Sequence, residues 1–154
     1  MNMKIFKMLA LAAVMVLSVV ACSKEKTQGG GGTTGGFDGI ENEWRLVSVG
    51  GVANDFTVYI KFEGGVFTMY QQVYSLDYVA YSGQYSIDGG VLSGSYFDGS
   101  DWKTSYKGGV SGTTLTLTSQ EENAITSVYE VCTIPEEVKA EADGTRALDV
   151  VPFL

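Results

Sequence analysis

The sequence predicts an all-β protein, an eight-stranded antiparallel up-and-down barrel that follows an export signal and a tether. Short runs of alternating apolar and polar residues follow one another from Glu43 to Thr133, as in strands with one buried face. Gly-Gly or Asp-Gly dipeptides separate many of these runs, and such dipeptides suit tight hairpin turns. Because closure removes the two open edges of a meander, we favour a barrel over the alternative, a β-sandwich.

Three strands are expected in the first half of the domain, at residues 43–49, 56–62 and 66–72. In the second of these, every other residue from Phe56 to Phe62 is apolar, so one face points to a core. The Glu63-Gly64-Gly65 turn that follows indicates a hairpin, because glycine accepts the positive φ of primed turns. Residues 73–80 are open between a long loop and an extension of the next strand.

Five further strands are expected in the second half, and turn residues again separate them. Asp88-Gly89-Gly90 joins a strand that holds Tyr81 and Tyr85 to one that holds Leu92 and Tyr96. The Asp98-Gly99-Ser100-Asp101 turn then leads to a strand with Trp102 and Tyr106, and the last two strands cover 113–119 and 125–133. After Pro135, the run EEVKAEA predicts a short helix.

The first 22 residues are typical of a bacterial lipoprotein signal. Lys4 and Lys7 precede an apolar run, Met8–Val20, which is interrupted only by Ser18 and is shorter than the roughly 20 residues of a membrane span. Val19-Val20-Ala21-Cys22 resembles the lipobox, in which the cysteine is acylated after cleavage. We therefore expect residues 1–21 to be a signal peptide and Cys22 to carry two or three acyl chains, which together anchor a protein durably. No aspartate follows Cys22, which favours the outer membrane; the leaflet stays open.

Residues 22–39 are expected to be a tether between this anchor and the folded domain, residues 40–154. Six of the eight residues from 29 to 36 are glycine, a composition that resists helix and strand and gives a reach of roughly 25 Å. Removal of residues 1–21 leaves 8 basic and 18 acidic residues, a net charge of −10. So negative a chain repels nucleic acid, and we expect no nucleic-acid partner.

From Ile40 to Ile134 the chain resembles the lipocalin-like domains of many lipoproteins from Gram-negative bacteria. The resemblance rests on an early tryptophan in Glu43-Trp44-Arg45-Leu46, on Tyr85-Ser-Ile-Asp-Gly-Gly, and on Leu115-Thr-Leu-Thr-Ser with Val128-Tyr-Glu-Val. It implies a small antiparallel barrel with room for a ligand. True lipocalins open with Gly-X-Trp, whereas Asn42 stands at the glycine position here, and barrels of this kind serve many functions.

Little in the sequence points to catalysis or metal binding, and we expect neither a catalytic residue, a metal site nor a cofactor. Histidine, the commonest general base and metal ligand, is absent. The Asp98–Asp101 turn offers too few oxygens for calcium, which takes about six to eight, so we interpret it as a capped turn. Cys132 has no histidine partner and reads as an inert small residue, and with Cys22 lipidated it has no disulfide partner.

Aromatic residues are the main candidates for ligand contacts. The inward positions expected to line a barrel interior, either as core or as ligand contacts, are Trp44, Tyr81, Tyr85, Trp102, Tyr106 and Tyr129. We therefore expect a non-enzymatic envelope lipoprotein that binds a small apolar or amphipathic ligand in its barrel. The alternative is a structural or protein-interaction module of the outer membrane with a filled barrel, and packing distinguishes the two.

Overall fold

The structure, a computed structural model, describes residues 36–73, 75–143 and 150–154, all of which belong to one compact unit, Thr33–Leu154. The expected signal peptide, the lipidation site Cys22 and the tether up to residue 35 lie outside the described residues. The described residues form nine strands and one helix: β1 (Glu43–Val49), β2 (Val52–Ala53), β3 (Thr57–Glu63), β4 (Val66–Gln72), β5 (Val79–Asp88), β6 (Val91–Tyr96), β7 (Tyr106–Ser111), β8 (Thr114–Ser119), β9 (Thr126–Val131) and α1 (Glu136–Asp143).

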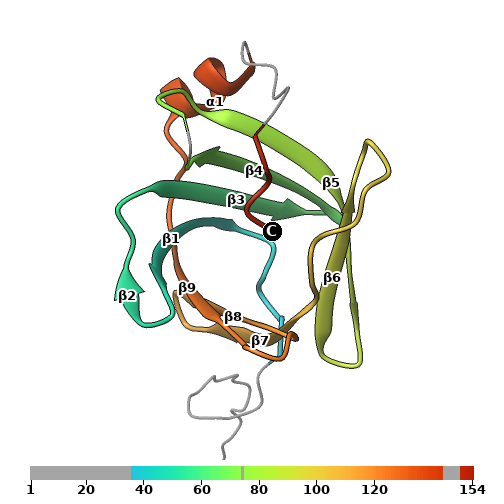
Figure 1. The fold of residues 1–154 in the computed structure, drawn as a ribbon. Coiled ribbons are helices and arrows are strands. Elements are labelled where there is room, and N and C mark those ends of the chain that lie inside the picture. The colour runs from blue at the N-terminus through green and yellow to red at the C-terminus, as the bar shows by residue number, and fades with distance from the viewer. Residues whose placement is uncertain (1–35, 74, 144–149) are drawn as a thin grey trace, which may run out of the picture. The chain divides into compact units, whose positions relative to one another are not determined.

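The nine strands form one antiparallel sheet that closes into a ring (Figure 1). Neighbours along the chain pair from β3 to β9, and β1 closes the ring by pairing with both β3 and β9. The all-β prediction is confirmed, and the described strands make one closed sheet rather than the two sheets of a sandwich. Nine strands form instead of eight because Val52–Ala53 folds back on the end of β1 across Gly50 and Gly51, whose φ values are 60° and 81°.

Two of the predicted hairpin turns are confirmed by their backbone conformation. Gly64 and Gly65 have φ values of 58° and 80°, and Gly89 and Gly90 have values of 57° and 78°. Positive φ at both central residues defines the primed turn whose twist matches that of the flanking strands. The turn residues therefore determine the register locally, with Glu63 opposite Val66 and Asp88 opposite Val91.

The prediction that Trp102 lies on a strand is wrong, because β7 begins only at Tyr106. The connection after β6 still contacts β6 at Trp102, whose main-chain N–H donates to the carbonyl oxygen of Gly94 at 3.0 Å. Regular pairing between β6 and β7 begins only where Tyr106 lies opposite Leu92. The indole of Trp102 lies against Gly94, where an added Cβ would come within 2.5 Å of it. A glycine at position 94 therefore leaves the space that the indole fills.

The side chains inside the ring form one apolar core. Alternate residues of each strand point inward, and many are fully buried, among them Leu46, Ile60, Phe67, Leu92, Leu117 and Tyr129. The segment before β1 joins this core through Phe37 and Ile40, which are 5 % and 3 % exposed. Folded structure therefore starts before residue 40, where the sequence places the end of the tether.

Residues 150–154 insert into the ring, and the C-terminus lies near the middle of the ring in Figure 1. Leu154 is buried in the core, and Phe153 packs on Phe56 with ring centroids 5.8 Å apart. The buried amide of Gln71 accepts from the Phe153 N–H at 2.8 Å and donates to the Val151 carbonyl oxygen at 3.0 Å. Both ends of this side-chain amide are therefore used to hold the C-terminal segment to β4.

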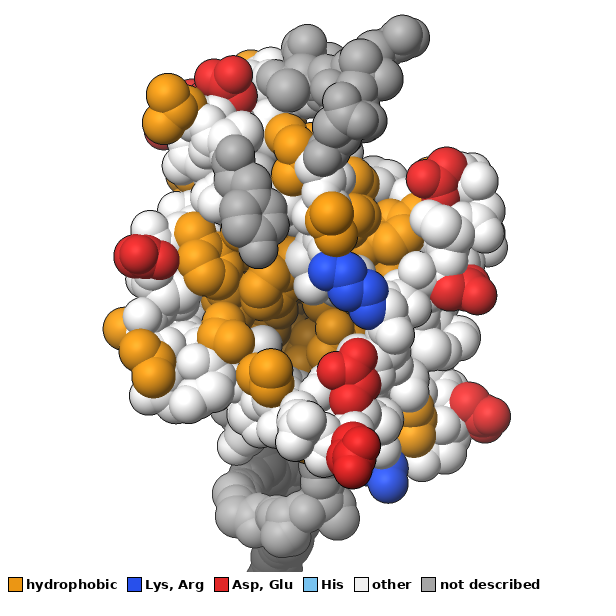
Figure 2. All heavy atoms as spheres, in the orientation of Figure 1, with side chains coloured by type: hydrophobic (Ala, Val, Ile, Leu, Met, Phe, Trp, Pro, Cys, Tyr) orange, Lys and Arg blue, Asp and Glu red, His pale blue; other side chains and the backbone are white. Residues whose placement is uncertain are grey.

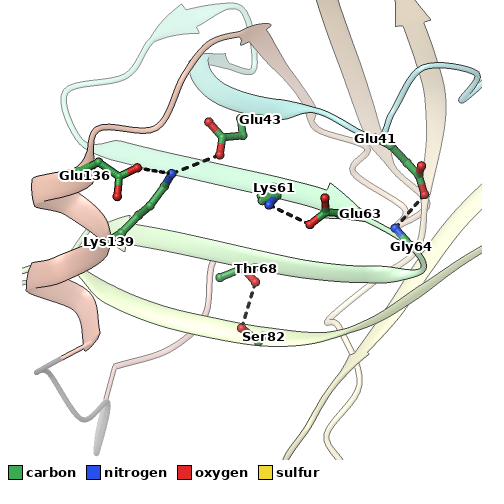
Figure 3. Close-up of polar contacts among 9 residues, drawn as sticks. All are labelled: Glu41, Glu43, Lys61, Glu63, Gly64, Thr68, Ser82, Glu136 and Lys139. Atoms are coloured by element: carbon green, nitrogen blue, oxygen red, sulfur yellow. Dashed lines mark hydrogen bonds and ion pairs between the residues drawn. The ribbon is translucent and has the colours of Figure 1, made fainter.

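Helix α1 packs against β4 and β5, confirming the helix predicted after Pro135. Figure 3 shows Lys139 between two carboxylates, with Nζ 3.4 Å from Glu43 and 3.0 Å from Glu136. The other oxygen of Glu43 accepts the Ile134 N–H at 2.7 Å, so one carboxylate ties the start of the helical segment to β1. Within the described ranges, no helix has both the length and the apolar character needed to cross a membrane.

Candidate functional site

The six aromatic candidates all belong to the core or pack against it. Trp44, Trp102, Tyr106 and Tyr129 are buried, with exposed fractions of 8 % or less, and Tyr81 and Tyr85 are partly buried. Trp44 also donates from Nε1 to the Ile40 carbonyl oxygen at 2.8 Å, and Tyr81 donates to the carbonyl oxygen of Val150. The interior of the ring is thus occupied by the protein's own aromatic side chains and by its C-terminal residues.

Edge-to-face contacts hold the aromatic rings of the interior together. The ring of Phe67 lies 5.0 Å from that of Trp102 and 5.5 Å from that of Tyr96, and Trp102 lies 6.0 Å from Tyr106. Such pairs add stability beyond the area that they bury. Burial raises the pKa of Tyr106 to about 12 and also raises that of Tyr96, so both phenols are neutral at physiological pH. They can donate hydrogen bonds but do not supply a base.

A groove of about 560 Å³ lies beside the β5–β6 hairpin. It is lined by residues 84–86 of β5, residues 93–95 of β6, and Asp101, Trp102, Thr104 and Ser105 of the following connection. The side chains of Gln84 and Ser86 alternate with inward Tyr85, so they lie on the outer face of the ring. We call this feature the outer groove.

Strand register brings the polar side chains of the outer groove together. Gln84 lies opposite Ser95, and Ser86 lies opposite Ser93 with the two hydroxyl oxygens 3.3 Å apart. Asp101 pairs with Ser95 in an isolated antiparallel β-bridge, at the edge of β6 that faces away from β5. Two adjacent strands and the connection after β6 therefore present hydroxyl, amide and carboxylate groups on one surface.

Several polar groups of the outer groove are available to a ligand. Among the described residues, no protein group hydrogen-bonds to the side chains of Gln84, Ser95, Asp101 or Ser105. The indole Nε1 of Trp102 is buried and has no hydrogen-bond partner. A buried donor without an acceptor is costly.

Exposed apolar side chains lie on the connections at one end of the ring. Figure 2 shows apolar side chains gathered in a hollow on the face seen in Figure 1. Every second connection of an antiparallel ring lies at the same end, which here carries the connections after β1, β4, β6 and β8. These connections hold exposed apolar side chains, namely Val52, Leu76, Phe97 and Ile125.

The acidic turn and the cysteine behave as ordinary structural groups. One oxygen of Asp98 accepts from the Ser100 N–H at 2.8 Å and from its hydroxyl at 2.6 Å, and these bonds lower the pKa of Asp98. This carboxylate caps its own turn. Burial raises the pKa of the Cys132 thiol, so little of the nucleophilic thiolate is present at neutral pH. Within the described ranges, no three His, Cys, Asp or Glu residues lie close enough to hold a metal ion.

Comparison with known proteins does not assign this site. No protein-family model matches the chain, and a search of curated proteins found no similar sequence.

Of the six aromatic candidates, Tyr85 and Trp102 line the outer groove, whereas the other four are not among its lining residues.

The sequence reasoning missed the hydroxyl and amide residues of the outer groove. Their signal was present in the repeated Ser-Gly-X-Tyr element at 82–85 and 93–96. In this element glycine and tyrosine point inward, and the residues that alternate with them are serine and glutamine. The outer face of the hairpin therefore carries uncharged polar side chains.

Proposed function

We propose that the protein is a lipid-anchored lipoprotein of the cell envelope that binds a small amphipathic ligand without catalysing a reaction. In this proposal the ring of β1 and β3–β9 is an eight-stranded, lipocalin-like barrel, and β2 is an appendage of β1. The single observation that carries ligand binding is the outer groove, whose volume of about 560 Å³ falls in the range of small-molecule sites.

The ligand site in this proposal is the outer groove rather than the interior of the ring. Phe153 and Leu154 already pack among the inward side chains, and an interior ligand would have to displace them. The outer groove presents unpaired polar side chains, and its lining also includes Tyr85 and Trp102, whose rings pack against the core behind it; a lining that is both polar and apolar suits an amphipathic molecule.

A titration followed by nuclear magnetic resonance tests ligand binding. The full chain is titrated with a panel of small amphipathic probes comprising indole, a neutral disaccharide and a short-chain alcohol. At least one probe is expected to shift the amide resonances of residues 84–86, 93–95 and 101–105 saturably. Ser93→Phe, which fills the groove, should abolish these shifts, whereas Ser111→Phe, at an exposed serine outside the groove, should not. Saturable shifts elsewhere, or none at all, would refute the proposal.

The lipid anchor rests on the sequence of residues 1–22 and has its own test. Cys22→Ala should move the protein from the membrane fraction to the soluble fraction, because the cysteine is the proposed site of acylation. Retention of Cys22→Ala in the membrane fraction after a high-salt wash would contradict the anchor and leave ligand binding unaffected.

A second candidate function, a protein-interaction module, is favoured by the filled interior and by the apolar connections at one end of the ring. Leu76 and Phe97 are 90 % and 64 % exposed there, and exposed apolar patches mark interaction sites when they are contiguous. Crosslinking from Leu76 and Phe97 in intact cells distinguishes the two functions. One specific adduct that disappears on Leu76→Ser would favour the interaction module.

A further inference from the structure

We infer that the outer groove recognises a neutral saccharide. This inference rests on the proposed function, since it names the class of ligand for the same site. It starts from the chemistry of the lining, where Ser86, Ser93, Ser95, Thr104 and Ser105 supply hydroxyls and Gln84 supplies an amide. Hydroxyl and amide groups both donate and accept hydrogen bonds. Sugar hydroxyls do the same, so they can pair with these groups.

The charge of the groove excludes anionic ligands. Asp101 is the one charged residue among those that line it, and neither lysine nor arginine is present there. The whole chain carries a net charge of −8. A phosphate or carboxylate would therefore meet repulsion without a cation to offset it. The carboxylate of Asp101 is instead a strong acceptor for the hydroxyls of an uncharged ligand.

The available hydrogen-bonding groups exclude a wholly apolar ligand. Gln84, Ser95, Asp101 and Ser105 have side chains without a hydrogen-bond partner in the described part of the chain. Covering them with hydrocarbon would remove water from these groups without replacing its hydrogen bonds. A saccharide replaces the lost water with its own hydroxyls.

The position of Trp102 makes it a reporter of the groove. This side chain is 6 % exposed, it is among the residues that line the groove, and its Nε1–H has no acceptor. Gly94, also in the lining, pairs with inward Tyr85, and an added Cβ there would come within 2.5 Å of the indole, so the indole lies on the inner side of β6, behind the groove. A ligand in the groove is therefore expected to shift the Trp102 indole resonance from behind the groove wall, without contacting its N–H.

The test is a titration of the full chain in a detergent without a sugar headgroup. The probes are two neutral disaccharides, maltose and cellobiose, with glucuronate as the anionic probe and indole as the apolar one. The two indole N–H resonances, from Trp44 and Trp102, serve as reporters because Trp44 already donates to Ile40. A neutral disaccharide is expected to shift the Trp102 signal and the amides of the outer groove saturably, and to leave the Trp44 signal in place.

Single-hydroxyl variants sharpen this test. Ser95→Ala and Ser105→Ala should each weaken disaccharide binding by about 2- to 10-fold, the loss expected for one hydrogen bond. The control Ser111→Ala, at an exposed serine outside the groove, should bind as the parent does. Equal affinity of the parent, Ser95→Ala and Ser105→Ala would overturn the inference.

The outcomes separate the saccharide inference from the proposed function. Binding of indole but of neither disaccharide in the groove would overturn the saccharide class and leave ligand binding standing. Tighter binding of glucuronate than of the disaccharides would overturn the neutral character of the ligand. Failure of every probe to shift the groove resonances would overturn the inference and the proposed function together.

Discussion

The phenol of Tyr96 in β6 donates a hydrogen bond of 2.8 Å to the main-chain oxygen of Leu154. The bond joins two residues that are 58 positions apart and are both buried, at 7 % and 1 % exposed. Tyr96 also packs edge-to-face on Phe67 and on Tyr81. One side chain thus links the C-terminal residues to the aromatic core, so the C-terminal segment is part of the packing of the ring.

Truncation of Leu154 should destabilise the fold. Leu154→Ala removes a fully buried side chain, and such changes cost about 2–5 kcal/mol in the free energy of unfolding. Urea unfolding followed by circular dichroism measures the change. The control Val151→Ala, at a residue that is 54 % exposed, should cost much less. Similar losses for the two variants would show that Leu154 is not packed in the core.

Loss of the Trp44 side chain should also destabilise the fold strongly. Trp44→Ala is expected to cost about 3–5 kcal/mol, because the ring is 1 % exposed and its Nε1 donates to the Ile40 carbonyl oxygen. Trp44→Phe keeps most of the apolar volume and should cost less. A thermal melt checks both, and a near-neutral Trp44→Ala would contradict the burial of this ring.

A methyl group at Gly83 should disrupt the pairing of β5 and β6. Its Cβ would lie 2.0 Å from the Ser95 carbonyl oxygen and 2.7 Å from the Tyr96 Cα, and neither backbone atom can rotate away. Gly83→Ala should therefore cost about 2–3 kcal/mol, as other overpacked sites do. The neighbouring Ser82→Ala loses one hydrogen bond to Thr68 and should cost about 1 kcal/mol. Chemical denaturation should show a larger loss in the free energy of unfolding for Gly83→Ala than for Ser82→Ala.

Stability should fall in alkali. Burial raises the pKa of Tyr106 from its ordinary value of 10.0 to about 12, and it raises the pKa of Tyr96 as well. Between these values the unfolded chain has lost the phenolic proton while the folded chain retains it, so rising pH favours unfolding. The contribution of Tyr106 is fully present below about pH 10 and is lost by roughly 1.4 kcal/mol per pH unit up to about pH 12.

Urea midpoints measured from pH 9 to pH 12 check this pH dependence. Tyr106→Phe removes the titrating group and should make the fall shallower, whereas Tyr78→Phe, at a partly exposed tyrosine, serves as the control. A slope that is unchanged in Tyr106→Phe would show that this phenol titrates equally in both states.

The sequence by itself determined most of the strands, the two Gly-Gly hairpin turns and the helix after Pro135. Alternation and glycine pairs predict β1 and β4 to the residue, and the Gly64-Gly65 and Gly89-Gly90 turns adopt the conformation that their residues require. Each of these features depends on residues that are neighbours in the chain. Local steric limits and hairpin chemistry act over two to seven residues, so one sequence is enough to read them.

Tertiary structure alone decided what fills the ring and where the groove lies. Trp102 lies outside the strands, and its indole packs against Gly94 on the neighbouring strand. Leu154 is hydrogen-bonded in the core to Tyr96, which lies 58 positions earlier in the chain. No sequence periodicity predicts that contact. The outer groove needs Ser86, Ser93 and Ser105 from three different segments. Such features depend on distances between segments that come together only when the sheet closes, and the pattern of any one segment does not contain them.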